Sequence, residues 1–179
     1  MDEWTQGYSA AELDEAQERY GLRFPPDLVA LLRARRPVQA YDWRRDDEAI
    51  RKALEWPLEG LLFDLEHSDL WLPQWGERPD TMGGRAEVLT DLVHAAPRLI
   101  PIFGHRYIPE QPHRAGNPVF SVWQSDVIHY GADLADYIRR EFEPGVFPPQ
   151  PVTGTVRFIP FWSDLVGANG DAAGADRAR

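Results

Sequence analysis

The sequence predicts a single α+β domain in which helices pack against a mainly antiparallel sheet. A chain of 179 residues is long enough for one well-buried core. Its densest short apolar run lies within residues 98–109 and is typical of a buried strand. A second β-rich stretch follows at 117–130, whereas the flanking segments have helical or irregular patterns. The predicted core sheet therefore lies between residues 98 and 130.

The first predicted helix begins at a capping box formed by Ser9 and Glu12. The Ser9 hydroxyl can accept a hydrogen bond from the third helical N–H, while the Glu12 carboxylate reaches back to the amide of Ser9. The buried stripe of this helix consists of Leu13, Ala16 and Tyr20. Gly21 is placed to end it.

A second helix is predicted to start with Pro26 and Asp27 in its first turn, where a missing N–H is tolerated and a negative charge is favourable. Its buried stripe consists of Leu28, Leu31 and Leu32. Three basic side chains complement the C-terminal end of the helix dipole: Arg33, Arg35 and Arg36. Pro37 is expected to stop the helix.

Residues 38–76 give weaker signals. A short helical pattern runs from Ile50 to Trp56, but residues 61–76 alternate apolar and acidic side chains only in part, so periodicity favours neither helix nor strand there. Residues 79–84 are predicted to form a loop, with Gly83 and Gly84 in an ordinary turn. A clear helical face then ends at Pro97 and consists of Val88, Leu89, Leu92 and Val93.

The stretch 117–130 is predicted to be a β-hairpin with Ser125 and Asp126 at its turn. Asp133 is placed to cap a last amphipathic helix with a buried stripe of Leu134, Tyr137, Ile138 and Phe142. A Pro-rich extension starts at about residue 144, and a strand candidate covers 155–162. We expect the domain to span residues 1–162 and residues 163–179 to be a disordered tail.

The chain carries 19 basic and 29 acidic residues, a formal net charge of −10. This charge opposes binding to nucleic acid or to an anionic membrane surface, so a basic or neutral protein partner is favoured. The chain has no cysteine, no leader-like N-terminus and no stretch near the ~20 apolar residues of a membrane span. We therefore expect a cytoplasmic protein. Lys52 is the single lysine, a bias typical of GC-rich bacterial coding sequences.

Two segments together resemble the SMI1/KNR4 (SUKH) superfamily. Residues 18–32 resemble its opening helix, glycine, apolar-Pro turn and second helix. Residues 99–104, followed by 116–122 and by the helix from Leu134 to Phe142, resemble the family's sheet and the helix after it. Order and spacing agree over residues 9–142. The segment Arg35-Arg36-Pro37 stands where the family often has Asn-Gly.

The resemblance implies an α+β fold and a binding function. Bacterial members of the family are regarded as immunity proteins that neutralise a co-encoded toxin, often a nuclease or deaminase, and fungal relatives as regulatory binding proteins. The family is associated with no catalytic residues, so the resemblance implies neither an enzyme nor a cofactor. The expected partner is a basic toxin domain.

An acidic and aromatic stretch is the candidate partner surface. Aromatic side chains supply anchors at interfaces, while carboxylates complement a basic partner. The candidate residues are Asp64, Glu66, Asp69, Trp71, Trp75 and Glu77. In the alternative interpretation, Trp71 and Trp75 belong to the core and the acids are merely solvated.

One histidine and carboxylate grouping offers an alternative function as a metal-dependent hydrolase. It consists of His105, Glu110, His113 and His129. The spacing from His105 to His113 matches no recognised helical zinc motif, so we expect no metal site. There is also no nucleophile elbow around a serine and no phosphate-binding glycine loop. A third hypothesis is a housekeeping scaffold that docks through the Pro-rich residues 147–151.

Overall fold

The computed structural model describes residues 4–142 and 152–176 and confirms the predicted α+β class. Six α-helices and a short 3₁₀ helix lie in this part of the chain: α1 (Ala10–Tyr20), α2 (Pro26–Ala34), α3 (Asp47–His67), η1 (Pro73–Trp75), α4 (Met82–Ala95), α5 (Leu134–Phe142) and α6 (Trp162–Asp176). The strands are β1 (Trp4–Gln6), β2 (Arg35–Pro37), β3 (Leu99–Phe103), β4 (Arg106–Pro109), β5 (Val119–Trp123) and β6 (Asp126–Gly131). Among the described helices, none is long and apolar enough to cross a membrane.

The central sheet is an antiparallel meander of β3, β4, β5 and β6 in that order. The prediction of one strand over 98–109 was wrong, because the chain reverses at Gly104 and His105 and forms two paired strands. Gly104 has a φ of +53°, which glycine adopts without steric cost. The predicted hairpin at 117–130 is confirmed, although its turn residues are Gln124 and Ser125.

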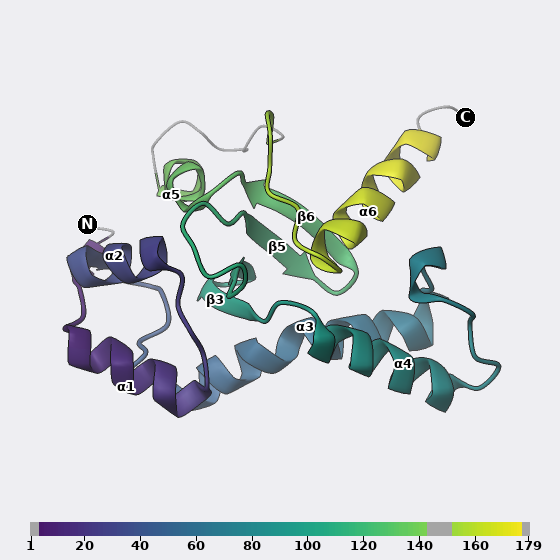
Figure 1. Cartoon of the computed structure of the whole chain (residues 1–179), viewed down its shortest axis with the longest axis horizontal. Helices are drawn as coiled ribbons and strands as arrows, with labels where there is room; N and C mark the ends of the chain where they lie inside the picture. The colour runs from purple at the N-terminus through teal and green to yellow at the C-terminus, as the bar shows by residue number, and fades with distance from the viewer. Residues whose placement is uncertain (1–3, 143–151, 177–179) are drawn as a thin grey trace.

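Both faces of this sheet are buried, so its strands carry apolar residues almost continuously. One face packs in a cluster with α1, α2 and α5, and the other with α3, α4 and α6 (Figure 1). On the first face lie Ile100, Ile102, Ile108, Val119 and Tyr130. On the second lie Leu99, Tyr107, Phe120, Val122 and Val127. Burial on two sides removes the alternation that marks a half-exposed strand.

The two N-terminal helices form largely as predicted. The capping box at Ser9 is present, and Gly21 ends α1 in the left-handed conformation with a φ of 61°. However, α2 ends at Ala34, so Arg35 and Arg36 do not extend the helix as expected. They lie in β2, which pairs antiparallel with β1. At the other end of the sheet, the predicted Asp133 cap is also present, since its carboxylate accepts from the amide of Asp136 at 2.8 Å.

Helix α3 is 21 residues long and extends well beyond the predicted pattern at 50–56. It continues through Pro57, which has no N–H to donate to the carbonyl of Ala53. The buried Tyr107 hydroxyl donates to that carbonyl instead, at 2.9 Å. A side chain of the sheet therefore satisfies the backbone group that the proline leaves free, and α3 is joined to β4 at this point.

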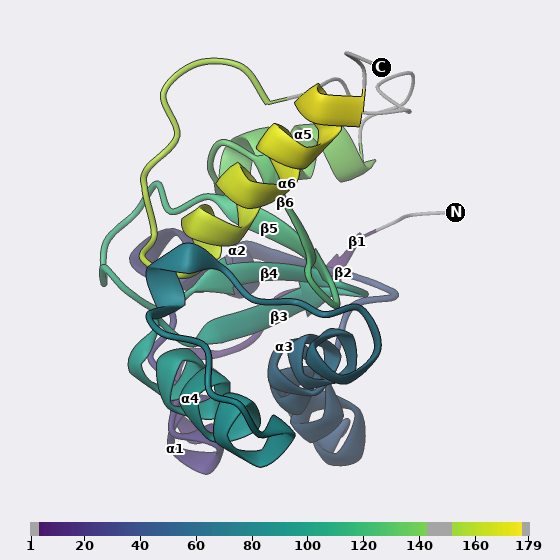
Figure 2. The same ribbon diagram turned by 90° about the vertical axis from the view of Figure 1, so that its right-hand side faces the viewer.

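The next turns of α3 press against the tip of the β5–β6 hairpin (Figure 2). A Cβ at Gly60 would lie 2.9 Å from the Cα of Gln124, so only glycine allows this approach. One turn later, the Asp64 carboxylate accepts from the amide of Ser125 at 2.9 Å and from its hydroxyl. The side-chain amide of Asn169 on α6 donates to the carbonyl of the same Ser125 at 2.9 Å.

The C-terminal predictions need correction. The strand candidate at 155–162 is wrong, because residues 155–159 form no paired strand and α6 begins at Trp162. The predicted disordered tail is also wrong for residues 163–176, which belong to α6. Helix α6 lies along β6 and fills the core with Trp162 and Leu165. The Pro-rich residues 144–151 lie outside the described residues.

The predicted loop at 79–84 also needs correction, because Gly83 and Gly84 lie in the first turn of α4.

Replacing Gly60 with alanine tests the close approach of α3 to the hairpin. We expect Gly60→Ala to lower the free energy of unfolding by about 1–3 kcal/mol, because its Cβ would overlap backbone atoms that cannot give way. The matched control is Gly83→Ala, at a helical position with nothing within 4 Å, where the same change should be neutral or stabilising. Equal effects of the two variants in urea unfolding would contradict the predicted contact.

The contact between Tyr107 and Ala53 can be tested by a double-mutant cycle. Tyr107→Phe leaves the Ala53 carbonyl buried without a donor and should cost about 1–3 kcal/mol of unfolding free energy. Pro57→Ala supplies an N–H to the same carbonyl. In that background Tyr107→Phe should cost distinctly less, measured by urea unfolding. Simple additivity of the two changes would show that the hydroxyl does not replace the missing helical donor.

Candidate functional site

The six residues of the predicted partner surface do not form one surface. Asp64 is buried and bonded to Ser125, so it holds the β5–β6 turn and does not belong to an exposed patch. Trp75 is also buried, with its ring 5.5 Å from Trp71 and stacked at 6.0 Å on Phe161. The interpretation of Trp75 as a core residue therefore describes it correctly.

The other four predicted residues remain accessible to different degrees. Glu66 and Glu77 are exposed, and Asp69 is exposed but forms an ion pair with Arg78. Trp71 is half-buried, and its indole N–H donates to the carbonyl of Gly76 at 3.0 Å. These four residues therefore keep part of the predicted site at the surface, around the C-terminal end of α3 and the segment that contains η1.

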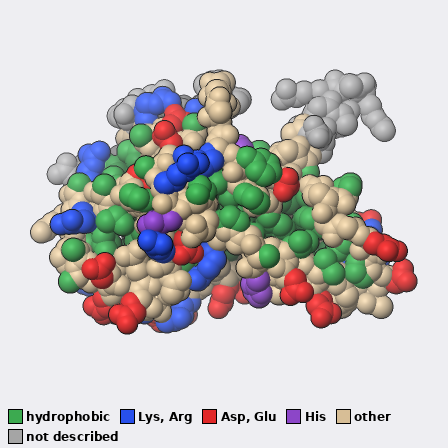
Figure 3. Space-filling view, viewed as in Figure 1, with side chains coloured by type: hydrophobic (Ala, Val, Ile, Leu, Met, Phe, Trp, Pro, Cys, Tyr) green, Lys and Arg blue, Asp and Glu red, His purple; other side chains and the backbone are tan. Residues whose placement is uncertain are grey.

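This region belongs to a strongly acidic unit, residues 47–97, which we call the acidic arm. It comprises α3, η1 and α4 and holds 11 acidic and four basic residues, a net charge of −7 of the chain's −10. Several exposed carboxylates of the arm make no ion pair within the described structure: Glu66, Glu77, Asp80, Glu87 and Asp91. In Figure 3, acidic side chains gather at the end of the molecule where α4 lies.

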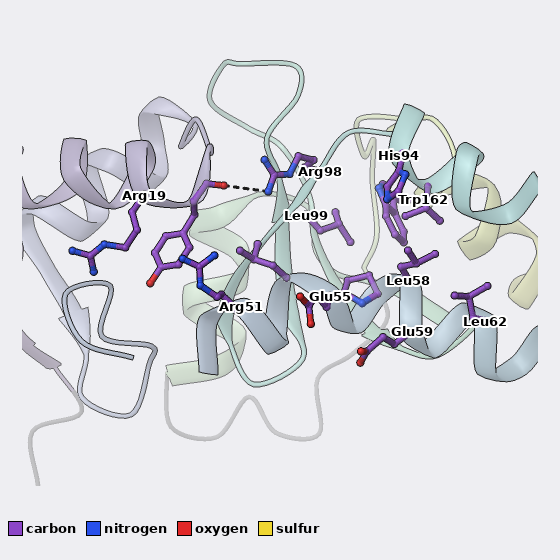
Figure 4. Close-up of a pocket in the computed structure, with 14 residues that line it drawn as sticks. Arg19, Arg51, Glu55, Leu58, Glu59, Leu62, His94, Arg98, Leu99 and Trp162 are labelled. Carbon is purple, nitrogen blue, oxygen red and sulfur yellow. Dashed lines mark hydrogen bonds between the residues drawn. The ribbon is translucent and has the colours of Figure 1, made fainter. Parts of the chain in front are cut away.

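A cleft of about 760 Å³ lies where α1, α3 and α4 meet (Figure 4). Its apolar lining includes Leu58, Leu62, Leu99 and Trp162. Three arginines line one end, but each already has a partner. Arg19 pairs with Glu15 at 2.6 Å and Arg51 with Asp47 at 3.0 Å, while Arg98 donates to the carbonyl of Gly21 at 2.7 Å.

Glu55 and Glu59 line the same cleft from α3 (Figure 4). Together with Glu15 and Asp47, these carboxylates offset the positive charge of the arginines. His94 is the one histidine among the lining residues, and no serine or threonine lines the cleft beside it. The arrangement provides an apolar groove with polar edges, without a nucleophile and base pair among its lining groups.

The predicted histidine and carboxylate grouping is not assembled into a metal site. Among the described residues, no three His, Cys, Asp or Glu side chains are placed to hold a metal ion. His105 lies edge-on to Trp123 at 5.8 Å, and His129 packs against Phe120 at 5.1 Å. Burial lowers the pKa of both histidines, so both rings are predominantly neutral at pH 7. Their surroundings are aromatic, which suits packing more than ligation.

No family model matches the chain, and neither a curated protein nor a solved structure is significantly similar to it. The relation to the SMI1/KNR4 superfamily therefore stays a prediction based on the residues quoted above.

Comparing Asp64 with Glu66 tests whether the first is buried and structural while the second is an exposed surface residue. Asp64→Asn should lower the free energy of unfolding by about 1–3 kcal/mol, because a buried charge-assisted hydrogen bond to the Ser125 turn is weakened. Glu66→Gln should change it by no more than about 0.5 kcal/mol, since the side chain is exposed and unpaired. Chemical unfolding of both variants measures this. Equal free energies of unfolding for the two variants would show that Asp64, like Glu66, is a surface residue without a structural role.

Proposed function

We propose that this chain is a non-enzymatic binding protein of the SMI1/KNR4 type, acting in the cytoplasm as an immunity protein against a co-encoded bacterial toxin. The toxin would be a nuclease or deaminase with a basic face. The observation that carries the proposal is the concentration of charge on the acidic arm, where exposed carboxylates lack ion-pair partners within the described structure. The sequence resemblance of residues 9–142 to that superfamily is the second support for the proposal.

The chemistry of such a toxin explains why unpaired carboxylates matter. A protein that acts on nucleic acid presents Lys and Arg to phosphates, and a surface of carboxylates can occupy the same positions. Charges of one sign on a projecting unit also steer a basic partner and raise the association rate. Because these carboxylates are already solvated and unpaired, no internal ion pair has to break when the partner binds.

Exposed apolar side chains on the acidic arm supply contact area between the charges. Phe63 on α3 is 49% exposed and Met82 at the start of α4 is 40% exposed. Interfaces draw most of their affinity from a few such anchors, while surrounding charges set orientation and rate. The proposed mechanism is therefore occlusion: the arm covers the toxin's substrate site and performs no chemistry itself.

Neutralising two arm carboxylates should weaken the complex with the toxin encoded beside this gene. We expect Glu66→Gln combined with Glu77→Gln to raise the Kd about tenfold or more at low salt, because each exposed charge contributes to a steered encounter. Isothermal titration calorimetry measures the Kd, and rescue of growth in cells that express the toxin reports protection.

The matched control removes two exposed, unpaired acids from α1, by Asp14→Asn combined with Glu18→Gln. This variant has the same net charge as the arm variant and should keep nearly the wild-type Kd. If both double variants weaken binding equally, the effect is one of overall charge and the acidic arm is not the binding face. If no adjacent gene product binds at all, the immunity function itself is contradicted.

A further inference from the structure

A separate hollow of about 400 Å³ lies between α3 and the ends of β4 and β5, and we call it the aromatic groove. Five of its lining side chains carry rings: Tyr41, Trp56, His105, Tyr107 and Trp123. Ala53 on α3 and Gly104 at the β3–β4 turn leave the space between the rings open. The same packing of α3 against the β5–β6 hairpin that fixes the fold therefore creates this groove.

The rings are steeply inclined to one another and form the walls of the groove. Trp56 and Trp123 have centroids 5.4 Å apart and planes inclined by 56°, and His105 stands at 78° to Trp123 with centroids 5.8 Å apart. Trp123 is 54% exposed. This is unusual, because the indole ring has the largest apolar surface of any side chain and is mostly buried in folded proteins. Tyr41 is held in place because its hydroxyl donates to the carbonyl of Gly104 at 3.0 Å.

No carboxylate lines the groove itself, but Asp126 lies at its edge, directly opposite Trp123 in the strand register. The Asp126 carboxylate is exposed and forms no ion pair in the described part of the chain. Glu55 and Glu59 on α3 line the cleft beside α1 and α4 instead. Lys52 is the single cation among the lining residues, and Glu48 lies one helical turn before it.

Electron-rich ring faces with a carboxylate at their edge are suited to a cation. A guanidinium is planar, weakly hydrated and stacks on indole faces, whereas an ammonium holds its water more tightly. We propose that the aromatic groove receives the guanidinium of an arginine side chain displayed by a basic protein partner. The proposal deepens the proposed function and rests on it for the identity of the partner, while the groove's affinity for arginine can be measured without that partner.

Further aromatic side chains follow Trp56 along α3, toward the C-terminal part of the acidic arm. Phe63 follows Trp56 by seven residues, so it lies on the same side of the helix, about 10 Å further along. The ring of His67 stacks on Phe63 at 4.2 Å. Glu59 and Glu66 lie on the same helix. A basic segment that places an arginine between Trp56 and Trp123 would therefore run over further anchors and carboxylates.

The test uses a synthetic hexa-arginine peptide and nuclear magnetic resonance of the ¹⁵N-labelled full chain. We expect the indole N–H signals of Trp56 and Trp123 to shift on titration. Trp123→Ala should weaken peptide binding about fivefold or more, and Trp123→Phe, which keeps a ring face, should restore part of it. Lys52→Ala should tighten binding because it removes the one lining cation.

The matched control is Phe158→Ala, which removes an apolar ring of similar exposure, 61%, outside the groove lining. It should bind the peptide as the wild type does. Shifts confined to amides of residues 66–91, or unchanged binding by Trp123→Ala, would overturn the groove proposal and leave the C-terminal part of the acidic arm, residues 66–91, as the binding face. Loss of the toxin interaction with an intact groove response would instead contradict the proposed function alone.

Discussion

The structure depends on how α3 is joined to the sheet, and the central contact is the hydrogen bond from the Tyr107 hydroxyl to the Ala53 carbonyl. Pro57 creates the need for this bond, since a proline inside a helix leaves one carbonyl without its usual donor. The following turns add Gly60, which permits close approach, and Asp64, which binds the hairpin turn. Three neighbouring turns of one helix thus fix its position on β4, β5 and β6.

The two candidate binding features follow from this arrangement. Because α3 is held along its middle, α3, η1 and α4 are presented together as the acidic arm (Figures 1 and 2). The aromatic groove forms where α3 meets the strand ends, and Tyr107 both binds Ala53 and lines the groove floor. A change that loosened α3 would therefore disturb stability and both surfaces at once.

Local signals were sufficient for part of the fold. The capping box at Ser9, the glycine after α1 and the β5–β6 hairpin are encoded within a few residues and are confirmed. The rest depends on tertiary contacts. The β3–β4 turn was missed because both faces of the sheet are buried and the apolar run hides the reversal. The second half of α3 was missed because a proline and alternating acids obscure a helix that the sheet stabilises.

The sequence indicated the types of residue in the site, acidic and aromatic, but not which of them are exposed. Asp64 and Trp75 are sequence neighbours of the surface acids, yet their partners, Ser125 and Phe161, come from distant segments and place them in the interior. The groove residues Trp56, His105 and Trp123 are likewise brought together only by folding. Helix α6 had too many glycines and alanines to be recognised, although its Asn169 binds the hairpin.

Hydrogen exchange of the complex with the adjacent gene's product locates the binding face. If a basic partner covers the acidic arm, amide exchange slows across residues 59–91 and at the β5–β6 hairpin and stays unchanged in α1 and α2. Slowed exchange confined to α1 and α2, with the arm exchanging as in the free chain, would contradict this binding face.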